Sequence, residues 1–148
     1  MNEEPNIDWV KDISEMHTKF GVNKIVRTFD ADKLKLFIEF RLKFLQEELT
    51  EAIDALANNN ADDIVDAMID LCVVAIGTLD ALDVNAYVAW DRVHDANMTK
   101  SPGIKASRPN PMGLPDLIKS DGWQAPSHAD NIGLMSKLLN GTVDSISS

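Results

Sequence analysis

The chain has 148 residues, a length that suits one domain. It carries 14 Lys and Arg against 24 Asp and Glu, which gives a net charge of −10 and a pI of about 4.6. Hydrophobic residues make up 45% and charged residues 26%, as in a globular chain. The acidic balance argues against nucleic acid as the main ligand, because phosphate backbones are bound by clustered Lys and Arg. The single Cys72 excludes an internal disulfide and a multi-cysteine zinc site.

No segment has the pattern of a membrane span or an export signal. The longest apolar run, residues 71–77, is far shorter than the roughly 20 residues of a spanning helix. The first five residues are polar and acidic, unlike a signal peptide. We therefore expect a cytoplasmic protein without a membrane partner, or one of the host cytoplasm if a phage encodes it.

Two helices and a connector are expected at the start of a helical core that spans about 7–100. The first is a short amphipathic helix over 7–20, which Gly21 ends. Residues 22–30 form the connector, and a long helix runs from residue 30 or 31 to about 57. Its apolar side chains recur at steps of three and four: Leu34, Ile38, Leu42, Leu45, Leu49, Ile53 and Leu56.

Two further helices are expected after residues 58–60, three asparagines that favour a turn. The next helix covers about 61–82, and Gly77 within it leaves room for another helix or a ligand to approach. Its apolar stripe consists of Val65, Met68, Ile69, Cys72, Ile76 and Leu79. Asn85 caps a fourth helix that continues to Met98. No alternating strand pattern of useful length occurs, so the expected fold is an all-α antiparallel bundle.

Residues 101–126 differ in composition from the helices, because Pro and Gly recur throughout this stretch. So many helix breakers predict a long loop, ordered or mobile. Residues 127–148 are expected to hold a short last helix and a frayed tail. Together with the helical core, these segments are expected to make one domain over 1–148.

Acidic residues gather on two helices that the asparagine turn makes antiparallel neighbours. Glu48 and Glu51 lie about 60° apart near the end of one helix, where Glu48 borders the apolar stripe. Asp63, Asp66 and Asp70 share one side of the next helix. Carboxylates that converge at one height repel each other unless a cation binds among them. Oxygen ligands favour Mg²⁺ or Mn²⁺ over zinc, and the alternative interpretation is a solvated acidic face.

Five short motifs occur in chain order. They are Met16-His17-x-x-Phe20-Gly21; Glu47-Glu48-Leu49-Thr50-Glu51; Asp66-Ala67-Met68-Ile69-Asp70 with the following Val73-Val74-Ala75-Ile76-Gly77-Thr78; Val93-His94-Asp95-Ala96-Asn97-Met98-Thr99-Lys100; and Lys119-Ser120-Asp121-Gly122-Trp123. Together they resemble motifs of the all-α nucleoside triphosphate pyrophosphohydrolases, the MazG-like and phosphoribosyl-ATP pyrophosphohydrolase-like superfamily, in its phage and bacterial single-domain branch. The resemblance covers roughly residues 13–125 and implies a MazG-like bundle.

One motif departs from the family's E-x-x-D pattern. When the chain is aligned through Gly77, Asp70 takes the place of the family's Asp and Ala67 falls where its Glu would be. Asp66 lies one helical turn from Asp70 and is favoured as the replacement carboxylate, with Asp63 as the outer candidate.

The resemblance implies hydrolysis of a nucleoside triphosphate between the α and β phosphates, which gives a monophosphate and pyrophosphate. The implied cofactor is Mg²⁺ or Mn²⁺. The implied metal ligands are Glu48, Glu51, Asp66 and Asp70, and the implied catalytic residues are Glu47, Glu48 and Glu51. Among the latter, Glu47 is expected to orient the water as a base or to act as an outer ligand.

Polar residues outside the acidic helices are expected to bind the substrate. Asn97 and Lys100 would bind phosphate or sugar, and Arg41 would pair with a carboxylate or reach a phosphate. Lys105, Arg108 and Lys119 either close over phosphates or only aid solubility. Trp123 either stacks on a base or anchors its loop to the core. His17 and His94 are expected to be structural or to support the ligands.

The helices are too few to cover their own apolar faces, and Phe37, Phe40 and Phe44 surround more of the long helix than one stripe needs. We therefore expect a homodimer, or a dimer of dimers, whose interface completes a four-helix core. The leading function is a metal-dependent (d)NTP pyrophosphohydrolase in nucleotide-pool control, for which a dGTP or dUTP preference is plausible. The alternatives are a phosphoribosyl-ATP pyrophosphohydrolase and a non-catalytic acidic helical binding protein.

Overall fold

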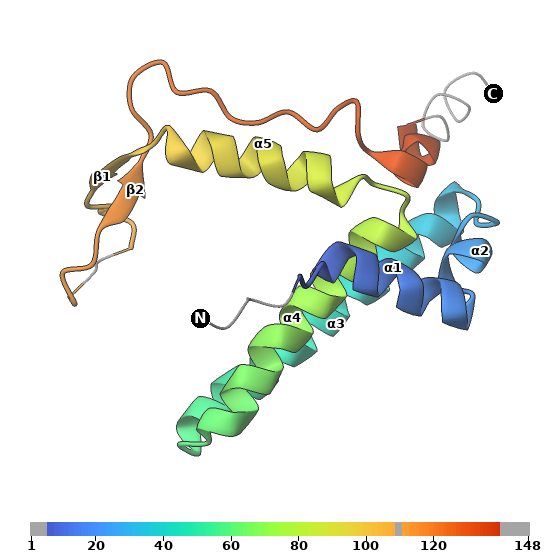
Figure 1. Ribbon diagram of the computed structural model, residues 1–148, viewed down its shortest axis with the longest axis horizontal. Helices are drawn as coiled ribbons and strands as arrows, with labels where there is room; N and C mark the ends of the chain where they lie inside the picture. The colour runs from blue at the N-terminus through green and yellow to red at the C-terminus, as the bar shows by residue number, and fades with distance from the viewer. Residues whose placement is uncertain (1–5, 109–110, 140–148) are drawn as a thin grey trace. The chain divides into compact units, whose positions relative to one another are not determined.

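The computed structural model describes residues 6–108 and 111–139, which divide into two compact units (Figure 1). The helical unit consists of the described residues up to Ala86 together with those from Ile132 onward. The hairpin unit is Tyr87–Asn131. In the described parts of the chain, no helix is long and apolar enough to cross a membrane.

Two short helices open the helical unit. Asp8 caps α1 (Trp9–Phe20) by accepting a hydrogen bond from the Lys11 amide at 3.0 Å. Gly21 ends α1 in the left-handed conformation with φ of 73°, as its position predicts. The predicted connector contains a further helix, α2 (Val22–Val26), which is too short to show a period in the sequence.

Helices α3 (Ala31–Ala57) and α4 (Ala61–Ala81) form an antiparallel pair. Their caps are local: Asp30 accepts from the Lys33 amide at 2.9 Å, and Asn60 accepts from the Asp63 amide at 3.1 Å. Both helices have the predicted bounds to within one or two residues. The all-α bundle is confirmed.

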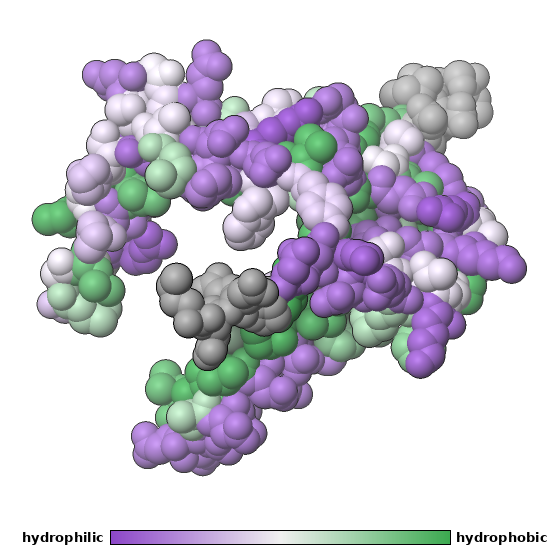
Figure 2. Space-filling view, viewed as in Figure 1, coloured by the Kyte–Doolittle hydropathy of each residue, from purple (hydrophilic) through white to green (hydrophobic). Residues whose placement is uncertain are grey.

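Small residues, not the predicted apolar stripes, hold the two helices together. Besides Leu34 and Ala81, the buried residues of α3 and α4 are Ala52, Ala55, Ala67, Val74 and Gly77. Several predicted core residues are exposed in the chain alone, namely Leu42, Leu49, Ile53, Leu56, Val65, Met68 and Ile69. Because alanine and glycine let the backbones approach, the larger side chains are displaced to the flanks. Figure 2 shows the resulting hydrophobic surface along the α3–α4 pair.

The core of the helical unit lies where α2, α3 and the end of α4 meet. Val26, Leu34, Ala81 and Leu82 are buried there, and Phe37 packs against them as an edge-on partner of Phe29. Burial of these apolar side chains is the main stabilising contribution.

The last described segment contains the predicted short helix and packs against this core. The segment consists of η1 (Gly133–Met135) and helical residues up to 139. The Leu134 amide donates to the Leu82 carbonyl at 2.7 Å. Lys137 Nζ donates to the carbonyls of Arg27 and Phe29 at 3.0 and 2.8 Å. The predicted frayed tail lies mostly outside the described residues.

The hairpin unit contains α5 (Ala86–Met98), which begins at the boundary, and an antiparallel strand pair. Strands β1 (Ser101–Gly103) and β2 (Asp116–Ile118) pair with Pro102 opposite Leu117. Arg108 Nη2 donates to Asp116 Oδ1 at 2.7 Å within the same hairpin. The sequence predicts only a loop here, because strands of three residues, one with a proline, carry no readable alternation.

Candidate functional site

The four predicted metal ligands are neighbours near the turn between α3 and α4. Glu48 and Glu51 lie late in α3, and Asp66 and Asp70 lie in the first half of α4. Burial, followed by the charges of Glu51 and Asp70, raises the pKa of Glu48 above its ordinary value. Hydrogen bonding with Glu51 and the charge of Asp66 raise this pKa further. All three other predicted ligands therefore act on Glu48.

One oxygen of Glu48 lacks a hydrogen-bond partner although it is buried. In the described parts of the chain, Glu48 Oε2 is one of three buried side-chain atoms in this state. A buried acceptor without a partner is costly unless a donor or a cation satisfies it. Together with its acidic neighbours, this oxygen gives a donor set that fits a hard cation such as Mg²⁺.

The carboxylates do not by themselves form a finished coordination sphere. Among the residues that the structure describes, no group of three or more His, Cys, Asp or Glu side chains is arranged to hold a metal ion. The chemistry of the donors thus fits Mg²⁺, whereas their geometry requires the side chains to close around it.

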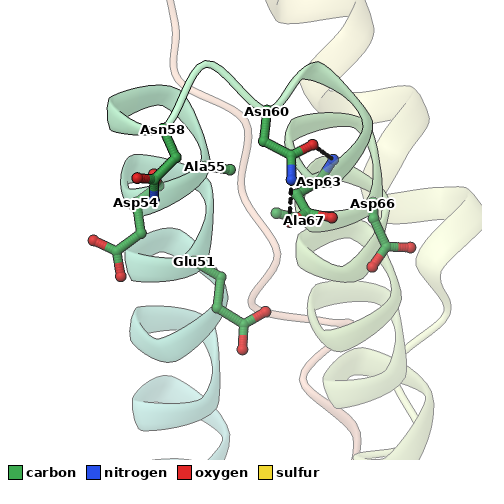
Figure 3. Close-up of a pocket in the computed structure, with 8 residues that line it drawn as sticks. All are labelled: Glu51, Asp54, Ala55, Asn58, Asn60, Asp63, Asp66 and Ala67. Carbon is green, nitrogen blue, oxygen red and sulfur yellow. Dashed lines mark hydrogen bonds between the residues drawn. The ribbon is translucent and has the colours of Figure 1, made fainter.

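A pocket of about 360 Å³ opens beside these residues at the end of the helix pair (Figure 3). Its lining is polar apart from two alanines and consists of Glu51, Asp54, Ala55, Asn58, Asn60, Asp63, Asp66 and Ala67. In Figure 3, Glu51 points from α3 toward α4, whereas Asp54 points away from it. Asp63 is engaged by Asn60, whose Nδ2 donates to Asp63 Oδ2 at 2.7 Å. Because of this bond, Asp66 is more available than Asp63 as a metal ligand.

The structure does not bring Glu47 to Glu48, although Glu47 shares an open pocket with Glu51. Glu47 is exposed, and this pocket is also lined by Lys43, Gln46 and Thr50. It is not among the charges that act on Glu48. Its assignment as the base that orients water remains a prediction.

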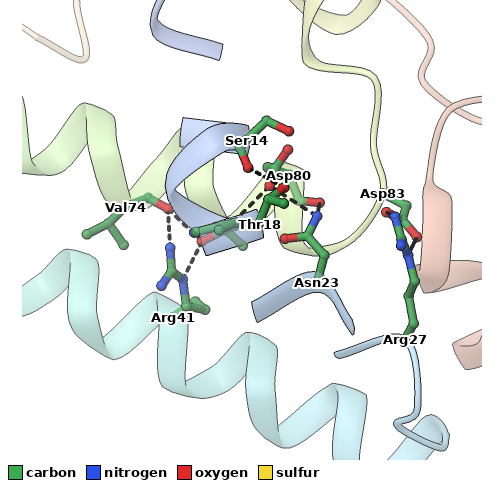
Figure 4. A network of polar contacts seen from close by, with 10 residues as sticks. Ser14, Thr18, Asn23, Arg27, Arg41, Val74, Asp80 and Asp83 are labelled. Carbon is green, nitrogen blue, oxygen red and sulfur yellow. Dashed lines mark hydrogen bonds and ion pairs between the residues drawn. The ribbon is translucent and has the colours of Figure 1, made fainter. Parts of the chain in front are cut away.

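A polar network joins α1, α2 and α3 to the second half of α4 (Figure 4). His17 is buried, and its Nδ1 lies 2.8 Å from Asp80 Oδ2. Asn23 Nδ2 donates to the same carboxylate at 3.1 Å. On the other side, Arg41 Nε donates to Thr78 Oγ1 at 2.9 Å. The sequence predicts a structural role for His17 but not these partners, since Asp80 lies outside every motif.

Comparison with known protein families decides the identity of this fold. Residues 22–97 match the phosphoribosyl-ATP pyrophosphohydrolase family. The chain belongs to this family. The match spans α2, α3 and α4 and reaches nearly to the end of α5, so it contains every predicted metal ligand. Neither the comparison with curated proteins nor that with solved structures gave a match.

This pyrophosphohydrolase carries most of its other predicted substrate ligands in the hairpin unit. Asn97 is the last residue of the family match, and Lys100, Lys105, Arg108, Lys119 and Trp123 follow it. The Trp123 indole N–H donates to the Ala96 carbonyl at 2.8 Å, which anchors the loop to α5. Arg108 is paired with Asp116. In the described part of this unit, Lys100 and Lys119 pair with no carboxylate and lie 5.2 and 5.1 Å from the Trp123 ring.

Proposed function

We propose that this pyrophosphohydrolase of the MazG-like superfamily hydrolyses a nucleoside triphosphate between its α and β phosphates, with Mg²⁺ or Mn²⁺ as cofactor. The observation that carries the proposal is the partly buried Glu48, with one oxygen unpartnered and three acidic neighbours, in a chain of this family. In the reaction, water adds to the α phosphorus and the bond to the bridging oxygen breaks, releasing pyrophosphate and a monophosphate.

Glu48, Glu51, Asp66 and Asp70 are the residues that would hold the metal ion. When bound, the ion neutralises phosphate charge and lowers the pKa of a coordinated water. The four carboxylates would fix the position of the ion at the turn end of α3 and α4, and through it that of the triphosphate. Lys100 and Lys119, with Asn97, are proposed to bind phosphate or sugar, and Lys105 and Arg108 to assist them. The anchoring bond of Trp123 supports a role in holding its loop.

Phosphoribosyl-ATP is a second candidate substrate, and the family match is equally consistent with it. It contains the same triphosphate and would be cleaved at the same bond. If the substrate is instead a nucleoside triphosphate, we propose that the enzyme controls nucleotide pools and prefers dGTP or dUTP. The two candidates differ in what is attached to the triphosphate and not in the chemistry.

The deciding experiment is pyrophosphate release from dNTPs, NTPs and phosphoribosyl-ATP, with Mg²⁺ or Mn²⁺ and with EDTA. We expect release with a monophosphate co-product that is lost in EDTA and in Glu48→Gln. Glu39→Gln, which changes an exposed glutamate of the same helix, is the matched control and should retain activity. Absence of turnover for every nucleotide, with a folded protein and no stabilisation by metal, would favour a non-catalytic binding protein.

We also propose that the enzyme is a homodimer or a dimer of dimers. Exposed apolar side chains support this assembly; on α3 and α4 they include Phe40, Ile53, Leu56 and Val65, each more than half exposed in the chain alone. Such side chains on a helix pair typically pack against a second copy.

A further inference from the structure

Arg41 is a partly buried cation held between α3 and α4. Its Nε donates to Thr78 Oγ1 at 2.9 Å and its Nη2 donates to the Val74 carbonyl at 3.0 Å (Figure 4). Both partners are neutral oxygens on α4. The guanidinium also lies 5.8 Å from the Phe44 ring. These contacts fix where the group sits without neutralising its charge.

No acidic side chain compensates this charge in the described parts of the chain. Arg27, Arg92 and Arg108 each form an ion pair, whereas Arg41 forms none. Its third nitrogen, Nη1, makes no hydrogen bond among the described residues. Burial lowers the pKa of Arg41, but a guanidinium remains protonated at neutral pH. A partly desolvated cation with one unengaged donor nitrogen is suited to an anion.

The position of Arg41 relates it to the carboxylates. It precedes Glu48 by seven residues, two turns of α3, so the two side chains leave the helix on nearly the same face about 10 Å apart along the axis. Its partner Val74 follows Asp70 by one turn of α4. From the turn inward, the helix pair therefore presents Glu51 and Asp66, next Glu48 and Asp70, and finally Arg41.

A glycine and a histidine make room for this arginine and support it. A Cβ at Gly77 would lie 2.7 Å from Arg41 Nη2 and 3.3 Å from the His17 ring. His17 is held in turn by Asp80 at 2.8 Å. The site is thus built from three helices, and a side chain at residue 77 would require Arg41 or His17 to shift.

We propose that Arg41 binds a phosphate group of the substrate through Nη1, adjacent to the phosphates that the four carboxylates bind through the metal ion. This inference rests on the proposed function for the identity of the substrate. It assigns the arginine a ligand that no residue of the described chain supplies. The matching chemistry is that of a polyphosphate, whose terminal charge would otherwise extend beyond the metal-bound part.

The test measures binding of inorganic pyrophosphate by calorimetry, with and without Mg²⁺, alongside KM and kcat for the best nucleotide. In Arg41→Met we expect pyrophosphate affinity to fall about tenfold or more, as for the loss of a charge-assisted hydrogen bond. Arg41→Lys should recover part of the loss. Arg27→Met removes the same charge and two hydrogen bonds from an exposed arginine of this unit and should leave binding unchanged.

Unfolding curves of each variant separate binding from folding. If Arg41→Met is unfolded, Arg41→Lys and Thr78→Val decide, since the first retains the charge and the second removes only the anchoring hydroxyl. Wild-type affinity for pyrophosphate in a folded Arg41→Met protein would overturn the proposal and leave Arg41 as a tie between helices. Pyrophosphate binding through Arg41 without nucleotide hydrolysis would instead overturn the proposed function and retain the anion site.

Discussion

At the scale of single residues, Glu48 is partly buried among acidic groups and Arg41 among neutral ones. Each side chain belongs to a partly exposed residue and forms no ion pair among the described residues. Two such groups on one helix face favour the binding of a complex that carries both positive and negative charge. A metal-bound polyphosphate has a cationic part for Glu48 and an anionic part for Arg41.

Replacement of Glu48 tests whether this residue binds the metal ion. Glu48→Gln removes one ligand charge, so we expect hydrolysis to fall on the order of 100-fold, since even the loss of a residue that supports a ligand costs 10–100-fold. Mg²⁺ should also no longer raise the melting temperature. Calorimetric titration with Mg²⁺ and scanning of the metal-free variant provide these values. Normal metal binding in Glu48→Gln would exclude this residue as a ligand.

The raised pKa of Glu48 predicts a pH dependence for the metal-free protein. In the folded state this carboxyl binds its proton more tightly than in the unfolded chain, so its contribution to stability is full at low pH. That contribution declines as pH rises from the ordinary glutamate pKa through the raised folded value. Thermal unfolding across this range should show the decline in wild type and not in Glu48→Gln. Equal slopes for the two proteins would contradict the prediction.

The sequence identifies Glu48 and its partners better than it identifies the role of Arg41. The acidic spacing and the turn place four carboxylates together, because residues near a tight turn have few alternatives. Arg41 depends on Val74 and Thr78, which lie 33 and 37 residues away. The sequence alone does not show whether Arg41 binds a carboxylate or a carbonyl so far away in the chain. The packed helices are needed to identify the partner.

At the scale of the elements, α3 and α4 approach through small residues, and a Cβ at Gly77 would lie 2.7 Å from Arg41 Nη2 and 3.3 Å from the His17 ring. Gly77→Ala should raise helix propensity yet destabilise the fold by about 1–3 kcal/mol, because the added Cβ meets Arg41 and His17. Chemical denaturation measures the change. Ala75→Leu, on the exposed side of α4, is the control and should have little effect. A more stable Gly77→Ala protein would show that the neighbours move aside at no cost.

The long helices are predictable from sequence and the short elements are not. The caps Asp8, Asp30 and Asn60 and the turn at Gly21 each act within three or four residues, so local rules suffice. Helix α2 and the strand pair β1–β2 depend on partners elsewhere in the chain. Pairing of Pro102 with Leu117 spans 15 residues and leaves no periodic signal in strands of this length.

At the scale of the whole molecule, the exposed apolar side chains of α3 and α4 predict self-association. Ile53→Lys would place a charge in the proposed contact, so we expect the assembly to weaken about tenfold or more. Sedimentation velocity over a range of concentrations measures the change. Glu15→Lys on α1 adds the same residue outside the apolar surface and should not alter the assembly. A wild-type protein that sediments as a monomer would contradict the proposal.

The hydrogen bond from Leu134 to Leu82 joins two points of the chain between which the whole hairpin unit lies. The two ends of the hairpin unit are therefore close together on the helical unit. We expect that this unit, as an exchangeable cassette, can be replaced without disrupting the core. Joining residue 86 to residue 132 through a short Gly-Ser linker should leave a helical protein that unfolds cooperatively and still binds Mg²⁺. Within such an architecture, selection could replace the cassette to alter nucleotide preference while the acidic helices stay unchanged.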